Sequence, residues 1–189
     1  MKRIVCIALS IGLLAGCASL SNTAKIYREN WAASYNHGEL MFFNGHKDMR
    51  LVVHGVSGGG SRPEYVAALR EAMIGSHPGL TINFTETPKG EGAEAPTRIV
   101  VQADAAIAVT ARTVCQSSGP VATQRPGNAP ELLFAYCKRD RELSSLRLQL
   151  AAGSRPGDAA FDDAVGLATH RLLPLMDPLN KSQGCLSDC

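Results

Sequence analysis

Apolar and polar side chains alternate along several segments of the chain, which is the pattern of a strand with one buried face. The longest such segment runs from Arg98 to Arg112, and we expect this strand to end at Cys115. Branched or alternating apolar residues predict four shorter strands, at residues 49–54, 80–85, 132–137 and 146–150. The pattern therefore predicts a sheet of about five strands.

Two other segments have the 3.6-residue period of amphipathic helices. The first begins at residues 61–64 (Ser-Arg-Pro-Glu), which form a capping box, and it ends at Gly75. The second begins at residues 156–158 and ends at Pro174. The apolar faces consist of Val66, Leu69, Met73 and Ile74 in the first helix and of Phe161, Val165, Ala168 and Leu172 in the second.

These elements follow the order β-α-β-β-β-β-α and predict an α+β domain over residues 49–176. Because most strands alternate, we expect a mostly antiparallel sheet with one solvent-exposed face and two helices packed on the other, a two-layer sandwich. Residues 17–48 precede the domain as a lipid anchor and tether, and residues 177–189 follow it as a C-terminal tail.

Three aromatic side chains in the tether, Tyr27, Trp31 and Tyr35, recur at every fourth residue. This spacing places the three rings on one face if residues 23–35 form a helix. Such rings either pack onto the domain or form a docking patch for a membrane interface or a partner, since Trp and Tyr favour half-hydrated sites. The sequence leaves both interpretations open.

The start of the chain has the layout of a secretory signal. Residues 1–3 (Met-Lys-Arg) are basic at two positions, and an apolar run over residues 4–14 follows them. This run is too short to span a membrane, which takes about 20 apolar residues. It ends in Leu14-Ala15-Gly16-Cys17, so a cysteine lies at the exit of the signal.

Residues 1–17 resemble the signal peptide and lipobox of bacterial lipoproteins. The resemblance implies cleavage after Gly16 and acylation of Cys17, which holds the chain on a membrane at its periplasmic face. Two or three acyl chains anchor a protein stably, because each buried methylene contributes roughly 0.8 kcal/mol. Ala18 stands where enteric lipoproteins retained at the inner membrane carry aspartate, which implies the outer membrane. The domain also resembles, in layout alone, the small α+β lipoproteins of proteobacterial envelopes; this assigns no activity.

The net charge gives no basis for a nucleic-acid partner. The chain carries a formal charge of +2, and Lys2 and Arg3 belong to the signal, so the mature side chains sum to 2 − 2 = 0. A neutral chain lacks the basic excess that nucleic acids or acidic membrane surfaces attract.

The cysteines predict disulfides. Cys6 lies in the signal and Cys17 is the lipid-attachment residue, which leaves four of the six cysteines, an even number in an oxidising compartment. Sequence order favours two pairs, Cys115–Cys137 and Cys185–Cys189. The second pair does not have the Cys-x-x-Cys redox spacing, and an intermolecular link or a labile pair stays open for it.

A glycine-rich motif, Gly55-Val56-Ser57-Gly58-Gly59, matches the Gly-x-Ser-x-Gly pattern of serine hydrolases between a strand and a helix. Three features weigh against that function. The capping box starts four residues after Ser57, the predicted strand order is not that of the hydrolase fold, and the late histidine, His170, falls within a helix. A small serine hydrolase that uses Ser57 is therefore the alternative hypothesis.

The remaining candidate sites are weak. The glycine loop could hold an anion through backbone amides, but it lacks the Lys-Ser/Thr ending of a nucleotide-binding loop. His37, His46 and His54 do not have a metal-ligand spacing. We therefore expect no catalytic residues, cofactor, metal or small-molecule substrate. The favoured interpretation is a non-enzymatic, lipid-anchored envelope protein that binds or assembles with another envelope component, such as a protein partner.

Overall fold

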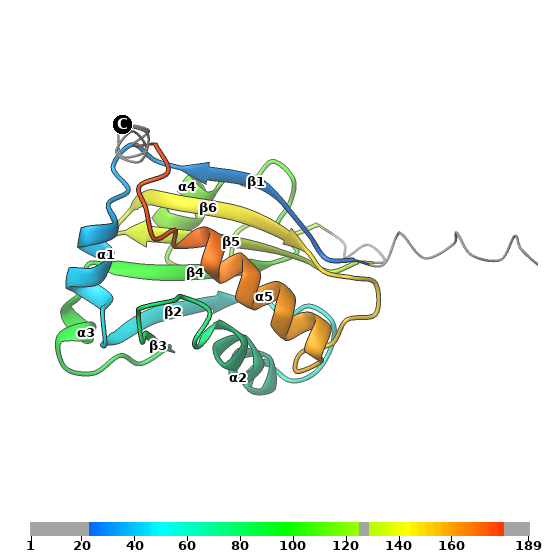
Figure 1. Cartoon of the computed structure of the whole chain (residues 1–189). Helices are drawn as coiled ribbons and strands as arrows, with labels where there is room; N and C mark the ends of the chain where they lie inside the picture. The colour runs from blue at the N-terminus through cyan, green and yellow to red at the C-terminus, as the bar shows by residue number, and fades with distance from the viewer. Residues whose placement is uncertain (1–22, 125–128, 180–189) are drawn as a thin grey trace, which may run out of the picture.

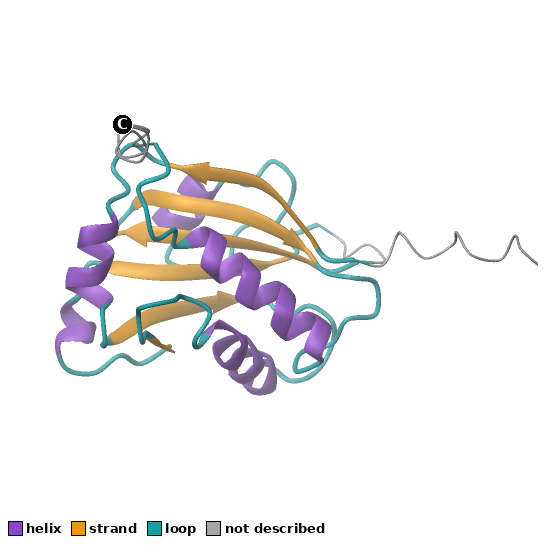
Figure 2. Cartoon of the chain, viewed as in Figure 1, coloured by secondary structure: helices purple, strands orange, loops and turns teal. Residues whose placement is uncertain are grey.

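A computed structural model of the chain describes residues 23–124 and 129–179, which fold into one sheet with helices on both of its faces (Figures 1 and 2). The predicted signal, the acylated Cys17 and the predicted pair Cys185–Cys189 lie outside the described residues. Among the described residues, no helix is both long enough and apolar enough to cross a membrane.

The sheet has six strands in the order β1-β6-β5-β4-β2-β3. In chain order the strands are β1 (Lys25–Trp31), β2 (Asp48–His54), β3 (Asn83–Thr85), β4 (Thr97–Ala103), β5 (Glu131–Lys138) and β6 (Arg141–Gln149). The helices are α1 (His37–Asn44), α2 (Arg62–Met73), α3 (Glu91–Glu94), α4 (Ala111–Gln116) and α5 (Ala159–Leu172).

The predicted α+β class is confirmed, but the sheet is mixed and has one strand more than expected. β1, β6, β5 and β4 pair in an antiparallel manner, whereas β2 is parallel to both β3 and β4. The parallel pairs arise because α2 connects β2 to β3 and α3 lies between β3 and β4, so each connection returns the chain to the same end of the sheet.

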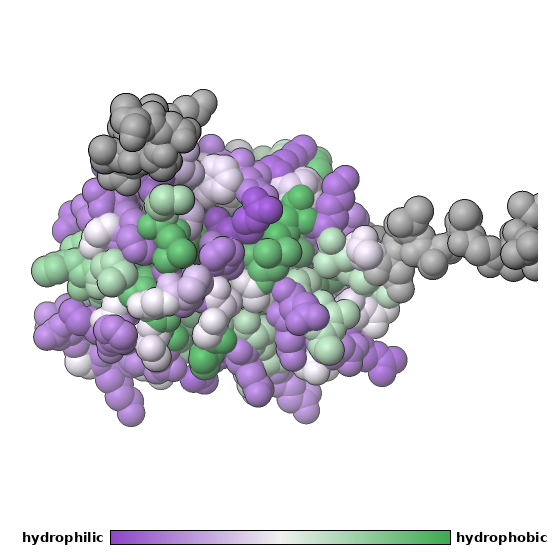
Figure 3. All heavy atoms as spheres, viewed as in Figure 1, coloured by the Kyte–Doolittle hydropathy of each residue, from purple (hydrophilic) through white to green (hydrophobic). Residues whose placement is uncertain are grey.

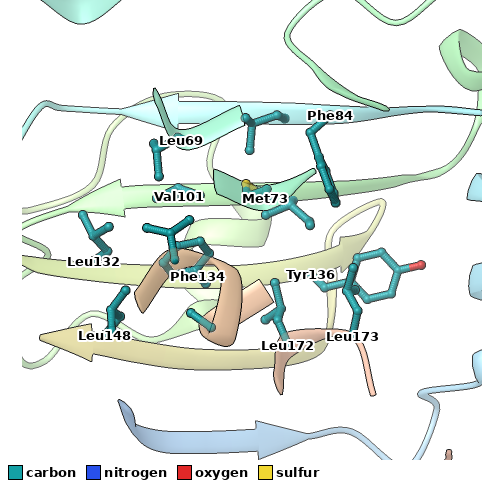
Figure 4. Close-up of a cluster of buried hydrophobic side chains, with 14 of the residues drawn as sticks. Leu69, Met73, Phe84, Val101, Leu132, Phe134, Tyr136, Leu148, Leu172 and Leu173 are labelled. Carbon is teal, nitrogen blue, oxygen red and sulfur yellow. The ribbon is translucent and has the colours of Figure 1, made fainter. Parts of the chain in front are cut away.

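Helices α2 and α5 cover one face of the sheet and enclose the main core (Figure 4). The capping box that the sequence predicts is present, with the Ser61 side chain accepting from the Glu64 amide and Glu64 accepting from the Ser61 amide. Leu69 and Met73 of α2 and Leu172 of α5 are fully buried above the sheet. Their neighbours on the strands are Val101, Phe134, Tyr136 and Leu148.

The opposite face is not fully exposed, contrary to the prediction. Helix α4 packs there against β4, β5 and β6 over a second, smaller core that includes Val100, Leu133 and Ala135. Alternation in the strands predicts a solvent-exposed face, but residues 111–116, which the pattern assigns to a strand, form helix α4 and cover part of it. The view in Figure 3 is of the α2 and α5 side, where hydrophilic residues surround separate apolar patches.

The helical interpretation of residues 23–35 is wrong: Lys25–Trp31 is strand β1, paired with β6. The register of β1 shifts between Tyr27 and Asn30, so Tyr27 lies opposite Arg147 and Trp31 lies opposite Ser144. Because alternate residues of a strand point to opposite faces, the two rings lie on different faces of the sheet, and the Trp31 indole donates to the Arg171 carbonyl of α5. Arg28, at φ +52°, lies where the register of β1 shifts.

The predicted long strand from Arg98 towards Cys115 is also wrong, because β4 ends at Ala103. Asp104 adopts the left-handed region, with φ +49°, which turns the chain out of the sheet. Thr110 then caps α4 by accepting from the Thr113 amide, and Cys115 lies on that helix. The strand expected at residues 80–85 is shorter, since only its last three residues pair as β3.

Candidate functional site

The candidate site lies at one end of the strands, where β2, β4 and β6 end and where β1 and β5 begin, on the right in Figure 1. By an edge we mean here this border of the sheet and not an outer strand. The first turns of α2 and α5 lie at the same edge, because each helix follows a strand that ends there. Ligands of α/β proteins commonly bind outside the carboxyl ends of parallel strands. We therefore describe this edge, which we call the anchored edge because β1 starts there, in detail.

Ser57 lies at this edge but is held as a buried structural residue. Its side chain is 3% exposed, and its hydroxyl donates to Asp104 Oδ2 at 2.9 Å. Asp104 Oδ1 accepts from the Glu131 amide at 3.1 Å, so both carboxylate oxygens are used. These bonds tie the glycine loop after β2 to the end of β4 and the start of β5.

The geometry around Ser57 does not match a hydrolase nucleophile. Such a serine needs an exposed hydroxyl and a histidine base, whereas the Ser57 hydroxyl points to a carboxylate and no described histidine bonds to it. Helix α2 begins at Arg62, five residues later, so its first turn is not directly behind the serine. The predicted motif is thus present in sequence but not brought together as a triad within the described residues.

A cleft of about 600 Å³ opens beside this loop. It is lined by Gly58, Gly59, Gly60, Glu64, Tyr65, Arg155 and Pro156. The glycines are required at one point in particular: Gly58 has φ +82°, and a Cβ there would lie 3.0 Å from the Ser154 carbonyl oxygen. The loop after β2 and the loop before α5 therefore approach backbone to backbone and form the two walls of the cleft.

The two charged side chains in the cleft, Glu64 and Arg155, carry opposite charges. Glu64 is ionised, since the backbone N–H and the hydroxyl of Ser61 donate to it and hold the pKa of its carboxyl below the usual range. Arg155 is exposed, and its guanidinium makes no ion pair with any residue in the described ranges. The cleft therefore presents one carboxylate and one guanidinium that is free to bind.

Tyr65 adds a polar group without a partner. Its side chain is 1% exposed and packs edge-to-face on Phe161, with ring centroids 6.2 Å apart. The hydroxyl is buried and has no hydrogen-bond partner among the residues described. Burial and the negative charge of Asp104 both raise the pKa of this hydroxyl, so it stays protonated and can donate. Unpaired buried hydroxyls are uncommon in native proteins and call for an explanation.

A buried ion pair lies at the same edge, on the face of the sheet that α4 covers. Arg147 is 2% exposed and contacts the Glu131 carboxylate, and its guanidinium also donates to the carbonyls of Ala105, Ala106 and Val109. Tyr27 donates to Glu131 at 2.5 Å, and burial raises the pKa of Tyr27 to about 12. This network fixes the loop between β4 and α4.

Sequence reasoning placed Arg147 on the polar side of a strand and did not identify it, Tyr65, Asp104 or Arg155 as part of a site. For Arg147 a signal existed: it stands between Leu146 and Leu148 in a strand whose neighbours are largely apolar, where an unpaired charge would be costly. Arg155 carried no such signal, because only the close approach to Gly58 brings it to the cleft.

The three histidines that the sequence offers as metal ligands, His37, His46 and His54, do not come together in one site. His46 and His54 flank β2 at its two ends, and His37 stacks on His77 with ring centroids 5.8 Å apart, at the sheet edge opposite the cleft. Within the described ranges, no group of three or more His, Cys, Asp or Glu side chains could hold a metal ion.

The predicted disulfide between Cys115 and Cys137 is confirmed, with the two Cα atoms 5.6 Å apart. It connects α4 to β5 within the second core, to which both cysteines belong. The remaining predicted pair lies outside the described residues.

Comparison with known proteins gives no relative: no protein-family model matches the chain, and no curated protein or solved structure matches it.

Proposed function

We propose that this chain is a non-enzymatic lipoprotein of the bacterial envelope, held on the periplasmic face of a membrane by acyl chains on Cys17, and that it binds another envelope component through the anchored edge. The observation that carries the proposal is the run Leu14-Ala15-Gly16-Cys17 at the end of a secretory-type signal. Ala18 at the next position favours the outer membrane.

The disulfide supports an exported location. A bridge between Cys115 and Cys137 is stable in an oxidising compartment such as the periplasm and is rare in the bacterial cytosol. The bonds made by Ser57 support a binding role rather than hydrolysis, since its hydroxyl is buried against Asp104.

Acylation is tested by membrane partition of two matched cysteine variants. Cys17→Ala removes the predicted attachment site, whereas Cys6→Ala changes a cysteine within the predicted signal and serves as the control. We expect the wild-type chain and Cys6→Ala to incorporate labelled palmitate and to sediment with membranes, and Cys17→Ala to do neither. Equal labelling of all three proteins, or none in the wild type, would refute the lipoprotein assignment.

Hydrolase activity is tested separately with a fluorophosphonate probe on the purified wild-type chain and on Ser57→Ala. The proposal predicts no stoichiometric labelling of either protein. Labelling of the wild type that Ser57→Ala abolishes would favour the serine hydrolase hypothesis instead.

A further inference from the structure

The point where the chain enters the fold limits which surface can face a membrane. β1 starts at Lys25, opposite Gln149 of β6, at the anchored edge. The eight residue steps from Cys17 to Lys25 span at most about 28 Å. Strand β6, with nine residues, is itself about 30 Å long. If Cys17 carries the anchor, the anchored edge is therefore the part of the domain nearest the bilayer.

The anchored edge presents groups that suit a membrane surface. Ile107 projects from the loop after β4 with its side chain 54% exposed. Its carbonyl accepts from the guanidinium of Arg28 at 3.0 Å, so an apolar side chain and a cation occur side by side. Lys25 and Arg155 are exposed at the same edge. Apolar side chains flanked by cations are typical of surfaces that lie at lipid headgroups.

The cleft lies at the same edge, beside the first turn of α2 and the loop before α5, and its charges match a zwitterion better than a simple anion. The guanidinium of Arg155 is exposed in the cleft and can donate to a phosphate. Glu64, held ionised at the first turn of α2, would repel a bare anion but can accept from an ammonium group. Its second carboxylate oxygen, Oε1, accepts no bond from the described residues, because the Ser61 contacts both go to Oε2.

We propose that the cleft binds the phosphoethanolamine headgroup of a lipid in the membrane that anchors the chain, with the phosphate at Arg155 and the ammonium at Glu64. This inference rests on the proposed function, because it takes the anchored edge to face a bilayer. The acyl chains on Cys17 supply the attachment, and the cleft then fixes the orientation of the domain on the surface.

The test uses the full acylated chain in vesicles of phosphatidylethanolamine and phosphatidylcholine, of phosphatidylcholine alone, and of phosphatidylglycerol and phosphatidylcholine. Flotation first establishes that the chain is vesicle-bound. Amide hydrogen exchange is then measured for the two walls of the cleft, residues 58–61 and 154–159. We expect exchange roughly tenfold slower with phosphatidylethanolamine than with the other two, as for a site near 90% occupancy.

Matched variants connect that protection to the proposed contacts. Arg155→Gln and Glu64→Gln should each abolish most of it, and glutamine at position 64 can still close the capping box. Arg141→Gln, at the start of β6 on the opposite edge, is the control and should retain full protection. Tyr65→Phe is a second control, because the hydroxyl it removes is buried and has no partner among the described residues, and it should also retain full protection.

Equal protection in all three vesicles, or protection that Arg155→Gln and Glu64→Gln both leave unchanged, would overturn the proposal. If flotation fails, the lipoprotein assignment has failed, and titration with free phosphoethanolamine then tests the cleft by itself. Saturable protection of residues 58–61 by the free compound that Arg155→Gln abolishes would keep a zwitterion site but overturn the bilayer as its source. No protection by the free compound would overturn the site as well.

Discussion

Buried polar groups have different surroundings at the anchored edge and at the opposite edge of the sheet. At the anchored edge, buried charges are paired: Arg147 with Glu131, and Asp104 with Ser57 and the Glu131 amide. At the opposite edge, His77 is 4% exposed, and neither of its ring nitrogens has a hydrogen-bond partner among the described residues. The anchored edge thus depends on paired charges, whereas the opposite edge contains a buried imidazole, His77, whose neutral form is favoured by burial.

The comparison teaches where this fold is sensitive to change. A buried charge pair becomes strongly destabilising when one partner is lost, because the other charge is left buried and unpaired. A buried histidine becomes more unfavourable when it is protonated, because burial penalises the charged form. Mutations should therefore act most strongly at the anchored edge, and mild acid should act at the opposite one.

The largest effect is expected from Arg147→Met. The substitution leaves Glu131 and three carbonyl groups without their partner in a buried site, so we expect a loss of about 3–5 kcal/mol in the free energy of unfolding. Urea denaturation followed by circular dichroism measures it. The double variant Arg147→Met with Glu131→Gln should regain part of the loss; a single variant as stable as the wild type would refute the role of the ion pair.

The disulfide should have the next largest effect. Replacing both Cys115 and Cys137 with alanine removes a bridge with a sequence separation of 22 residues. The loop-entropy model gives a loss of about 3 kcal/mol in the free energy of unfolding. Replacing both cysteines leaves no free thiol from the pair. Denaturation of the double variant, compared with the oxidised wild type, measures this loss, and the reduced wild type should match the double variant. Equal stability of oxidised and reduced wild type would show that the bridge does not constrain the unfolded chain.

A smaller effect is expected from Ser57→Ala, which removes the hydroxyl that donates to the Asp104 carboxylate. A hydrogen bond to a charged group contributes about 1.5–3 kcal/mol, so the free energy of unfolding should fall by that amount. Ser61→Ala, which removes the exposed cap of α2, is a comparison at about 1 kcal/mol. A loss at Ser57 no greater than that at Ser61 would contradict the view that the anchored edge depends on its buried charges.

The smallest effect is the pH dependence at the opposite edge. Burial, and the charge of neighbouring His37, hold the pKa of His77 below the value of about 6.5 for the unfolded chain. The unfolded state therefore binds the proton more tightly, and stability is full above about pH 6.5 and falls as the pH drops below it. The free energy of unfolding is measured for the wild type and for His77→Gln between pH 7.5 and 5.5. We expect the difference between the two proteins to narrow as the pH falls, because only the wild type loses stability through His77. A constant difference would show that His77 does not titrate differently on folding.

The fold could be predicted from sequence wherever a single period or motif decided the element. The capping box at Ser61 identified α2, and the apolar stripe through Phe161 identified α5. The pattern failed where a local backbone feature decided the outcome: Asp104 ended β4 through a left-handed backbone, and the register shift at Arg28 put Tyr27 and Trp31 on opposite faces of β1.

The candidate site was predicted only in part. The glycine loop was recognised by its motif, but its neighbours were not, because they come from separate elements. Asp104 follows β4, Tyr65 lies on α2, and Arg155 precedes α5; only the strand order β5-β4-β2 brings them to one edge. A single sequence contains no signal for that long-range arrangement, since it depends on which strands pair.

The most direct test of the central claim, that the domain is held on a membrane by Cys17, is the intact mass of the protein extracted from native membranes, measured before and after reduction. The account predicts the mass of residues 17–189 plus two or three acyl groups, and an increase of about two hydrogens on reduction for each disulfide, the Cys115–Cys137 bridge among them. An unacylated mass, or a chain that retains residues 1–16, would contradict the lipid anchor and with it the membrane-facing role of the anchored edge.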